Sequence, residues 1–101
     1  MLLFTALALW PGAVRADDLF WNRSDGGSFG TFSNWTPDTV PDGNDSAIFD
    51  LGNAGTYTVD FFAARSSEFL QVNTGDVTFN LGGNTYTIAN DVIVAESGRD
   101  D

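Results

Sequence analysis

The chain has 101 residues, no Cys, no His and a net charge of −10, with 14 acidic residues against four basic ones. This length fits one domain, and the acidity excludes nucleic acids and anionic lipid headgroups as partners, because both need a basic surface. Without Cys or His, disulfides, thiolate nucleophiles, Ser-His-Asp catalysis and His- or Cys-bound zinc are excluded within this chain. The many Gly, Thr and aromatic residues favour a turn-rich chain of strands.

Residues 1–16 have the pattern of a secretory signal peptide. The apolar run at 2–10 has the length of a signal-peptide core and is too short to span a bilayer as a helix. Val14 and Ala16 fit the small-residue positions of a cleavage site, which would place the mature N-terminus at Asp17. We therefore expect a protein that is secreted or displayed on a bacterial cell surface, with no membrane insertion by this chain.

Residues 17–45 form a segment in which large aromatic residues alternate with Gly, Ser, Asn and Asp. The aromatic residues are Phe20, Trp21, Phe29, Phe32 and Trp35. A short strand is expected at 19–22, followed by loops. We interpret the segment as a cap whose aromatic side chains cover the open end of a β-structure.

Residues 46–101 alternate between apolar and polar side chains in short runs, which is typical of strands with one buried face. Turns are expected at 52–55, 73–76, 82–84 and 89–91. The side chains expected to point inward are Ala47, Phe49, Tyr57, Val59, Phe61, Leu70, Val72, Val77, Phe79, Leu81, Tyr86, Ile88, Val92 and Val94. Among the residues that alternate with these inward side chains in 70–94, only Ile93 is apolar.

A weak internal repeat decides between two architectures. In an antiparallel β-meander or sandwich, Gly82-Gly83-Asn84 would close a hairpin. The motif Leu70-Gln71-Val72 recurs as Val92-Ile93-Val94 at a spacing of 22 residues, about one coil of a parallel solenoid. We therefore predict an all-β fold, a right-handed parallel β-helix, in which 17–45 is the cap and 46–101 the first coils, truncated at the C-terminus.

Several segments resemble one family of exported proteins. The segments are DGGSFGTFSNW (25–35), VPDGNDSAIFD (40–50), TYTVDF (56–61) and LQVNTGDVTFNLGGNTYTI (70–88). They look like the N-terminal region of autotransporter-like and PEP-CTERM-type bacterial surface proteins. That resemblance implies a secreted or surface-attached β-helical repeat protein with a structural or adhesive role.

Two groups of residues are candidate binding sites. Asp42, Asn44, Asp45 and Asp50 are oxygen donors close in sequence and could bind calcium, although their spacing matches neither an EF-hand nor a nonapeptide repeat. The alternative is a turn in which Asp and Asn bond their own backbone. Trp21 and Trp35 could form a platform for a sugar ring, the alternative being a buried aromatic core.

Catalysis is the least supported interpretation. Asp60 and Glu68 are the acids that could act as a carboxylate pair on a polysaccharide, but nothing in the sequence places them together. We expect a protein that is not an enzyme, needs no cofactor and acts as a structural or adhesive surface protein, possible partners being extracellular polysaccharide or cell-surface matrix. A carbohydrate-binding module is the second hypothesis and a truncated polysaccharide-degrading β-helix enzyme the third.

Overall fold

The computed structural model describes residues 17–52 and 55–94, which form two β-sheets. The strands are β2 (Asp18–Trp21), β3 (Gly27–Ser28), β4 (Trp35–Thr36), β5 (Ser46–Phe49), β6 (Thr56–Asp60), β7 (Arg65–Val72), β8 (Asp76–Asn80) and β9 (Tyr86–Val94). One 3-10 turn, η1 (Phe32–Asn34), precedes β4. The predicted signal peptide at 1–16 and the chain beyond residue 94 lie outside the described residues.

The five-stranded sheet has the order β4-β2-β5-β7-β9. Strands β2, β5, β7 and β9 pair in parallel, whereas β4 is antiparallel to β2. Residues in register across a sheet share a face, so the register defines a row of inward side chains: Leu19, Ala47, Leu70 and Val92. The predicted alignment of Leu70 with Val92 is therefore confirmed.

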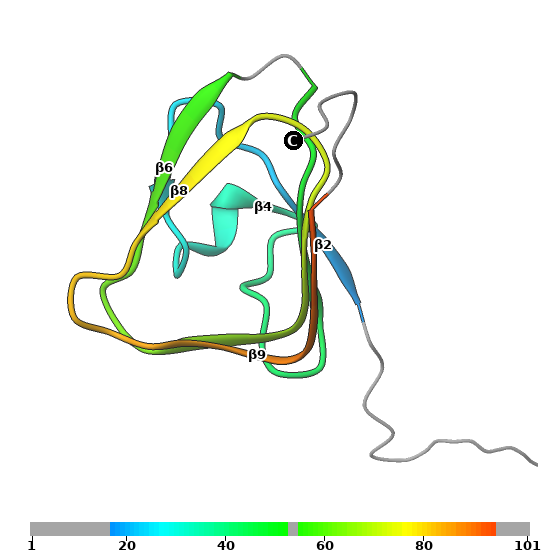
Figure 1. Ribbon diagram of the computed structural model, residues 1–101, viewed down its shortest axis with the longest axis vertical. Coiled ribbons are helices and arrows are strands. Elements are labelled where there is room, and N and C mark those ends of the chain that lie inside the picture. The colour runs from blue at the N-terminus through cyan, green and yellow to red at the C-terminus, as the bar shows by residue number, and fades with distance from the viewer. Residues whose placement is uncertain (1–16, 53–54, 95–101) are drawn as a thin grey trace, which may run out of the picture.

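The three-stranded sheet has the order β3-β6-β8, and both of its strand pairs are parallel. Tyr57 faces Val77 and Val59 faces Phe79 on the inner side. The predicted burial of Tyr57, Val59 and Phe61 is confirmed. In Figure 1, β6 and β8 run along one side of the molecule and β9 along another, and the segment that carries η1 and β4 is drawn inside this outline.

The prediction of a right-handed parallel β-helix is wrong. The described chain is a small, mostly-strand domain with mixed parallel and antiparallel pairing, and it includes a 3-10 turn. The reason lies in the aromatic segment: η1 reverses the chain, so that β4 returns alongside β2 with Trp35 opposite Trp21. The alternative, an antiparallel meander, also fails, because β8 and β9 belong to different sheets.

One predicted turn is also wrong. Ala89-Asn90-Asp91 lies within β9, which runs without interruption from Tyr86 to Val94. The register between β7 and β9 shifts between Ser67 and Phe69, and this irregularity accommodates the polar stretch inside the strand.

One core lies between the two sheets and includes the aromatic segment. Its buried members among the described residues are Leu19, Trp21, Phe29, Trp35, Ala47, Phe49, Tyr57, Val59, Phe61 and Leu70. Phe49 contacts Trp21, Trp35 and Phe79, with ring centroids between 5.4 and 5.7 Å apart. Residues from 17–45 and from 46–94 thus share one hydrophobic cluster.

Candidate functional site

Trp21 and Trp35, the predicted sugar platform, lie together in the core. Their rings meet edge to face at 5.2 Å and 81°, and both side chains are fully buried. Each indole N–H is already bonded within the chain: that of Trp21 donates to the carbonyl oxygen of Arg23 at 2.7 Å, and that of Trp35 to Phe29 at 2.8 Å. Neither ring presents an open face, so a sugar could stack on them only if the segment carrying β4 moved away.

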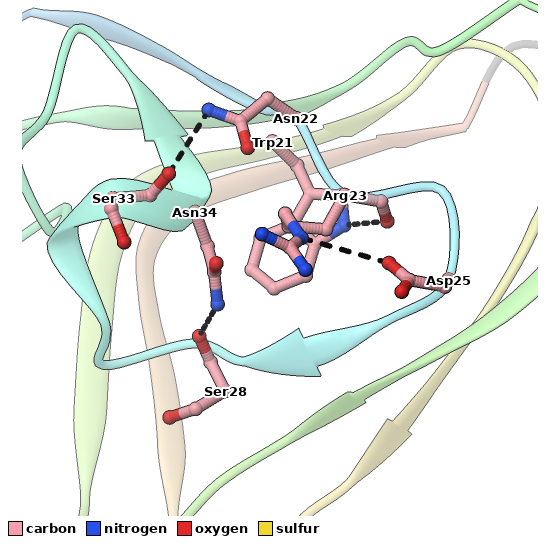
Figure 2. A network of polar contacts seen from close by, with 7 residues as sticks. All are labelled: Trp21, Asn22, Arg23, Asp25, Ser28, Ser33 and Asn34. Carbon is pink, nitrogen blue, oxygen red and sulfur yellow. Dashed lines mark hydrogen bonds and ion pairs between the residues drawn. The ribbon is translucent and has the colours of Figure 1, made fainter.

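The polar groups beside Trp21 hold the surrounding loops together (Figure 2). Asn22 Nδ2 donates to the carbonyl oxygen of Ser33 at 3.3 Å. It also donates to Thr36 Oγ1 at 2.9 Å. Asn34, which is buried, donates from Nδ2 to the carbonyl oxygen of Ser28 at 2.9 Å. These amides stabilise the reversal of the chain, because each one satisfies a backbone carbonyl of a neighbouring loop.

An exposed ion pair completes this network. Arg23 Nε lies 3.6 Å from Asp25 Oδ1, and both side chains are largely exposed. Such a pair contributes little to stability, because water and salt screen the attraction. The pair does, however, neutralise one of the two arginines of the described chain.

The candidate calcium ligands divide into two places. Asp42, Asn44 and Asp45 share the turn before β5, while Asp50 follows β5 at its other end. The four residues of β5 lie between them, and a strand of that length spans roughly 13 Å. The structure therefore brings three of the four predicted residues together and leaves Asp50 apart.

At the turn, the carboxylates accept hydrogen bonds from the backbone. Asp45 Oδ2 accepts from the N–H of Asp42 at 3.0 Å and Oδ1 from that of Asp17 at 3.3 Å, while Asp42 Oδ1 accepts from the N–H of Asn44 at 2.9 Å. Burial raises the pKa of Asp45, and the two backbone N–H groups partly offset this effect. The arrangement is that of a side-chain-stabilised turn. Within 17–52 and 55–94, no group of three or more His, Cys, Asp or Glu side chains is placed to hold a metal ion.

Asp50 belongs to a separate corner of the molecule. Its carboxylate accepts from Asn73 Nδ2 at 3.2 Å and from Thr74 Oγ1 at 3.3 Å. Burial, and secondarily the charge of Asp50, raises the pKa of Tyr57 to about 12. The Tyr57 hydroxyl is buried and has no hydrogen-bond partner among the described residues.

The suggested carboxylate pair is not assembled into a site. Asp60 ends β6 and accepts from Asn80 Nδ2 at 3.1 Å, whereas Glu68 lies on β7 of the other sheet and accepts from Asn90 Nδ2 at 3.5 Å. Each acid is thus paired with an asparagine on the neighbouring strand of its own sheet. This pairing relieves the repulsion that two acids in register would experience.

The sequence reasoning missed an apolar row on the outside of the five-stranded sheet. Phe20, Ile48 and Ile93 lie on this outer face, in register through Gln71. A signal for it existed: in the run Leu19-Phe20-Trp21 and in Ala47-Ile48-Phe49 the apolar residues are consecutive, so each strand carries apolar side chains on both faces.

No helix in the described part of the chain has the length and apolar character needed to cross a membrane. A scan against protein-family models, a search of curated proteins and a search of solved structures each returned no match.

Proposed function

We propose that this chain is a non-catalytic structural or adhesive protein of the cell exterior that assembles by adding strands at β8 and β9. The export part of the proposal is supported by the signal-peptide pattern of residues 1–16 and by the resemblance to exported surface proteins. The assembly part is supported by how burial changes along the inner face of the five-stranded sheet.

That change in burial is the observation that carries the proposal. Along the inward row, the exposed fraction is 1% for Leu19, 0% for Ala47 and 5% for Leu70, but 49% for Val92. Val94, in register with the half-buried Val72, is 59% exposed. Within residues 17–52 and 55–94, the core is thus covered at its β2 side and exposed at its β9 side, as expected of a surface that receives another strand.

The opposite side of the core is closed by the aromatic segment. Phe29 and Trp35 pack edge to face at 5.0 Å, and Phe29 stacks on Phe61 at 4.9 Å. The antiparallel strand β4 covers the β2 edge, which blocks strand addition there. Because only the β9 side of the described chain is open, two copies would join through the same side of each, which gives a closed dimer.

Export is tested by producing the full chain in a bacterial host that secretes proteins and by measuring the intact mass of the released product. The expected mass is that of a chain beginning at Asp17. Retention inside the cell, or release with residues 1–16 still attached, would contradict the export part of the proposal.

Assembly is tested by sedimentation velocity over a range of protein concentrations. Because the net charge of −10 opposes association, the measurement is made in about 1 M NaCl, where the Debye length is about 3 Å. The wild type is expected to form larger species as its concentration rises. Val92→Lys places a charge in the open row and should keep the protein monomeric.

Thr58→Lys is the matched control, since it adds the same charge on β6, which is the central strand of its sheet, at an exposed position. It should associate as the wild type does. A wild type that stays monomeric at every concentration, or equal loss of association in both variants, would overturn the assembly part of the proposal.

A further inference from the structure

The outer face of the five-stranded sheet carries an apolar patch that the core does not explain. Phe20 on β2 is 43% exposed and Ile93 on β9 is 40% exposed, and both point away from the core because their neighbours Trp21 and Val92 lie on the inner face. Phe69 on β7 is half-buried on the same outer face, in register with Ser46. We call Phe20, Ile48, Phe69 and Ile93 the outer patch.

Ile48 lies at the centre of this patch. It is only 5% exposed, yet it is not part of the core cluster that contains Ala47 and Phe49, its neighbours on β5. It lies beside Phe20 in register, and Phe69 is its diagonal neighbour on the next strand, two residues from Gln71, which is in register with Ile48. The patch is therefore continuous across β2, β5 and β7. Isolated exposed apolar residues are common and need no functional explanation, but a continuous patch does.

The outer face of the three-stranded sheet shows that such a patch is not a general feature of this chain. There the residues in register are Thr56 with Asp76, Thr58 with Thr78, and Asp60 with Asn80. All are polar, as expected of a sheet face in contact with water. The same chain thus builds one solvent-facing sheet surface from polar residues and the other around apolar ones.

The charges around the outer patch have one sign. Asp18 and Asp91 lie in the row that contains Ser46 and Phe69, at its two ends, and both are exposed. None of the residues in these rows is basic, so the patch presents apolar side chains inside an acidic rim.

We propose that the outer patch is a docking surface for an extended protein segment with an aliphatic residue at every second position and Lys or Arg at its two ends. The aliphatic side chains, which all point to one side of the segment, would cover Phe20, Ile48 and Ile93, and the basic residues at its two ends would meet Asp18 and Asp91. A second copy of this chain fits this face poorly, since its own patch would set Asp18 and Asp91 against the same two acids. This proposal concerns a sheet face, so it is independent of strand addition at β8 and β9.

The test uses the full chain and synthetic peptides about ten residues long, close to the length of a long strand. The Leu-Lys peptide has Leu at every second position, Ser between the leucines and Lys at both ends, and the Ser-Lys peptide has Ser in place of each Leu and the same charge. Binding is measured by titration calorimetry at physiological salt. The Leu-Lys peptide should bind at least about tenfold more tightly than the Ser-Lys peptide, because only the first can cover the patch.

The double variant Phe20→Thr/Ile93→Thr removes the exposed apolar side chains and keeps β-branched residues in the strands. Its affinity for the Leu-Lys peptide should fall at least about tenfold. Phe62→Thr is the matched control, because Phe62 is 77% exposed in the turn between the two sheets, outside the patch. Its affinity should match that of the wild type. Circular dichroism establishes that each variant is folded, and Ile93→Thr alone provides the same comparison if the double variant does not fold.

Three results would overturn the proposal. The first is unchanged Leu-Lys binding in the folded patch variant. The second is equal binding of both peptides, which would reduce the interaction to charge. The third is self-association of the wild type that Phe20→Thr abolishes and Val92→Lys leaves intact. That result would mean that the patch binds a second copy of the chain.

Discussion

The two sheets enclose the same core but differ on the faces that they turn away from it. The three-stranded sheet carries Thr, Asp and Asn on its outer face, and the five-stranded sheet carries Phe20, Ile48, Phe69 and Ile93 there. On the inside, both contribute aromatic side chains to one cluster, as the contact of Phe49 with Phe79 across the core shows. The inner faces therefore account for folding. The outer face of the three-stranded sheet suits contact with water, and that of the five-stranded sheet suits contact with a partner.

The largest expected effect is the difference in unfolding free energy between substitutions on the inner and on the outer face of the five-stranded sheet. Phe49→Ala removes a fully buried ring from the inner face and should cost about 3–5 kcal/mol of unfolding free energy. Phe20→Ala removes a ring from the outer face and should cost at most about 1 kcal/mol, because that ring is already partly hydrated. Urea unfolding followed by circular dichroism measures both.

Because Phe49→Ala threatens folding in a chain of this size, Phe49→Leu provides a milder version of the same change. Its loss of stability should still exceed that of Phe20→Leu. Equal losses at the two positions would mean that the outer patch is part of the folding core and would remove the distinction between the two faces.

The next effect compares one tyrosine from each sheet at alkaline pH. Burial raises the pKa of Tyr57, on β6, and of Tyr86, on β9, from 10.0 to about 12. Between these values the unfolded chain loses phenolic protons that the folded chain keeps, so stability falls as pH rises. The loss should stay below about 3 kcal/mol per tyrosine, and it is measured as urea unfolding at rising pH.

The chain has only two tyrosines, so the absorbance of tyrosinate reports on these two groups alone. Asp50→Asn should lower the pKa of Tyr57, since the carboxylate of Asp50 adds to the effect of burial there, and should leave Tyr86 unchanged. Two tyrosines that titrate near 10 in the folded protein would contradict the burial of both hydroxyls.

The hydroxyl groups of the same two tyrosines predict a smaller difference at neutral pH. Tyr86 Oη shares a hydrogen bond of 2.7 Å with Ser67 Oγ, and Ser67 is fully buried. Tyr86→Phe leaves the buried Ser67 hydroxyl without a hydrogen-bond partner and should lower the free energy of unfolding by about 1–2 kcal/mol. Tyr57→Phe removes a buried hydroxyl that has no partner among the described residues, so it should be neutral or slightly stabilising.

Urea unfolding of the two variants at neutral pH measures this difference, and Tyr86→Phe/Ser67→Ala is its control. Removing both hydroxyls should restore part of the stability lost in Tyr86→Phe alone. A loss in Tyr57→Phe as large as that in Tyr86→Phe would show that the Tyr57 hydroxyl has a partner.

The inward rows could be predicted from the sequence because alternation is a local property. Ala47 and Phe49, like Tyr57 and Val59, are buried where the period of two places them. The alignment of Leu70 with Val92 followed from a repeat in the sequence itself. In these cases the residues concerned carry the information without reference to distant parts of the chain.

The errors arose where distant contacts decide the structure. The reversal that sets Trp35 against Trp21 depends on a core built by both sheets, so the spacing of the aromatic residues alone could not predict β4. Ala89-Asn90-Asp91 has the composition of a turn, but pairing with β7 keeps it extended. The division of the proposed calcium ligands was foreseeable, since the extended segment that carries the inward residues Ala47 and Phe49 must separate Asp45 from Asp50.

The smallest predicted effect tests the polar outer face of the three-stranded sheet. Asn80 and Asp60 are in register, and Asn80 Nδ2 donates to Asp60 Oδ1 at 3.1 Å. Asn80→Asp replaces this bond with two facing carboxylates and should cost about 0.5–1 kcal/mol. About 1 M NaCl should recover much of the loss, because both groups are exposed to solvent.

Thr78 provides the control, since it lies on the same strand and face but is in register with Thr58, a neutral residue. The difference in urea stability between Thr78→Asp and Thr78→Asn isolates the cost of adding a charge without a carboxylate opposite. We expect this difference to be smaller than that between Asn80→Asp and the wild type. Equal differences would mean that the net charge of the chain, and not the register of the two strands, sets the penalty. In that case the asparagine opposite Asp60 would no longer explain how this face stays polar without destabilising its own sheet.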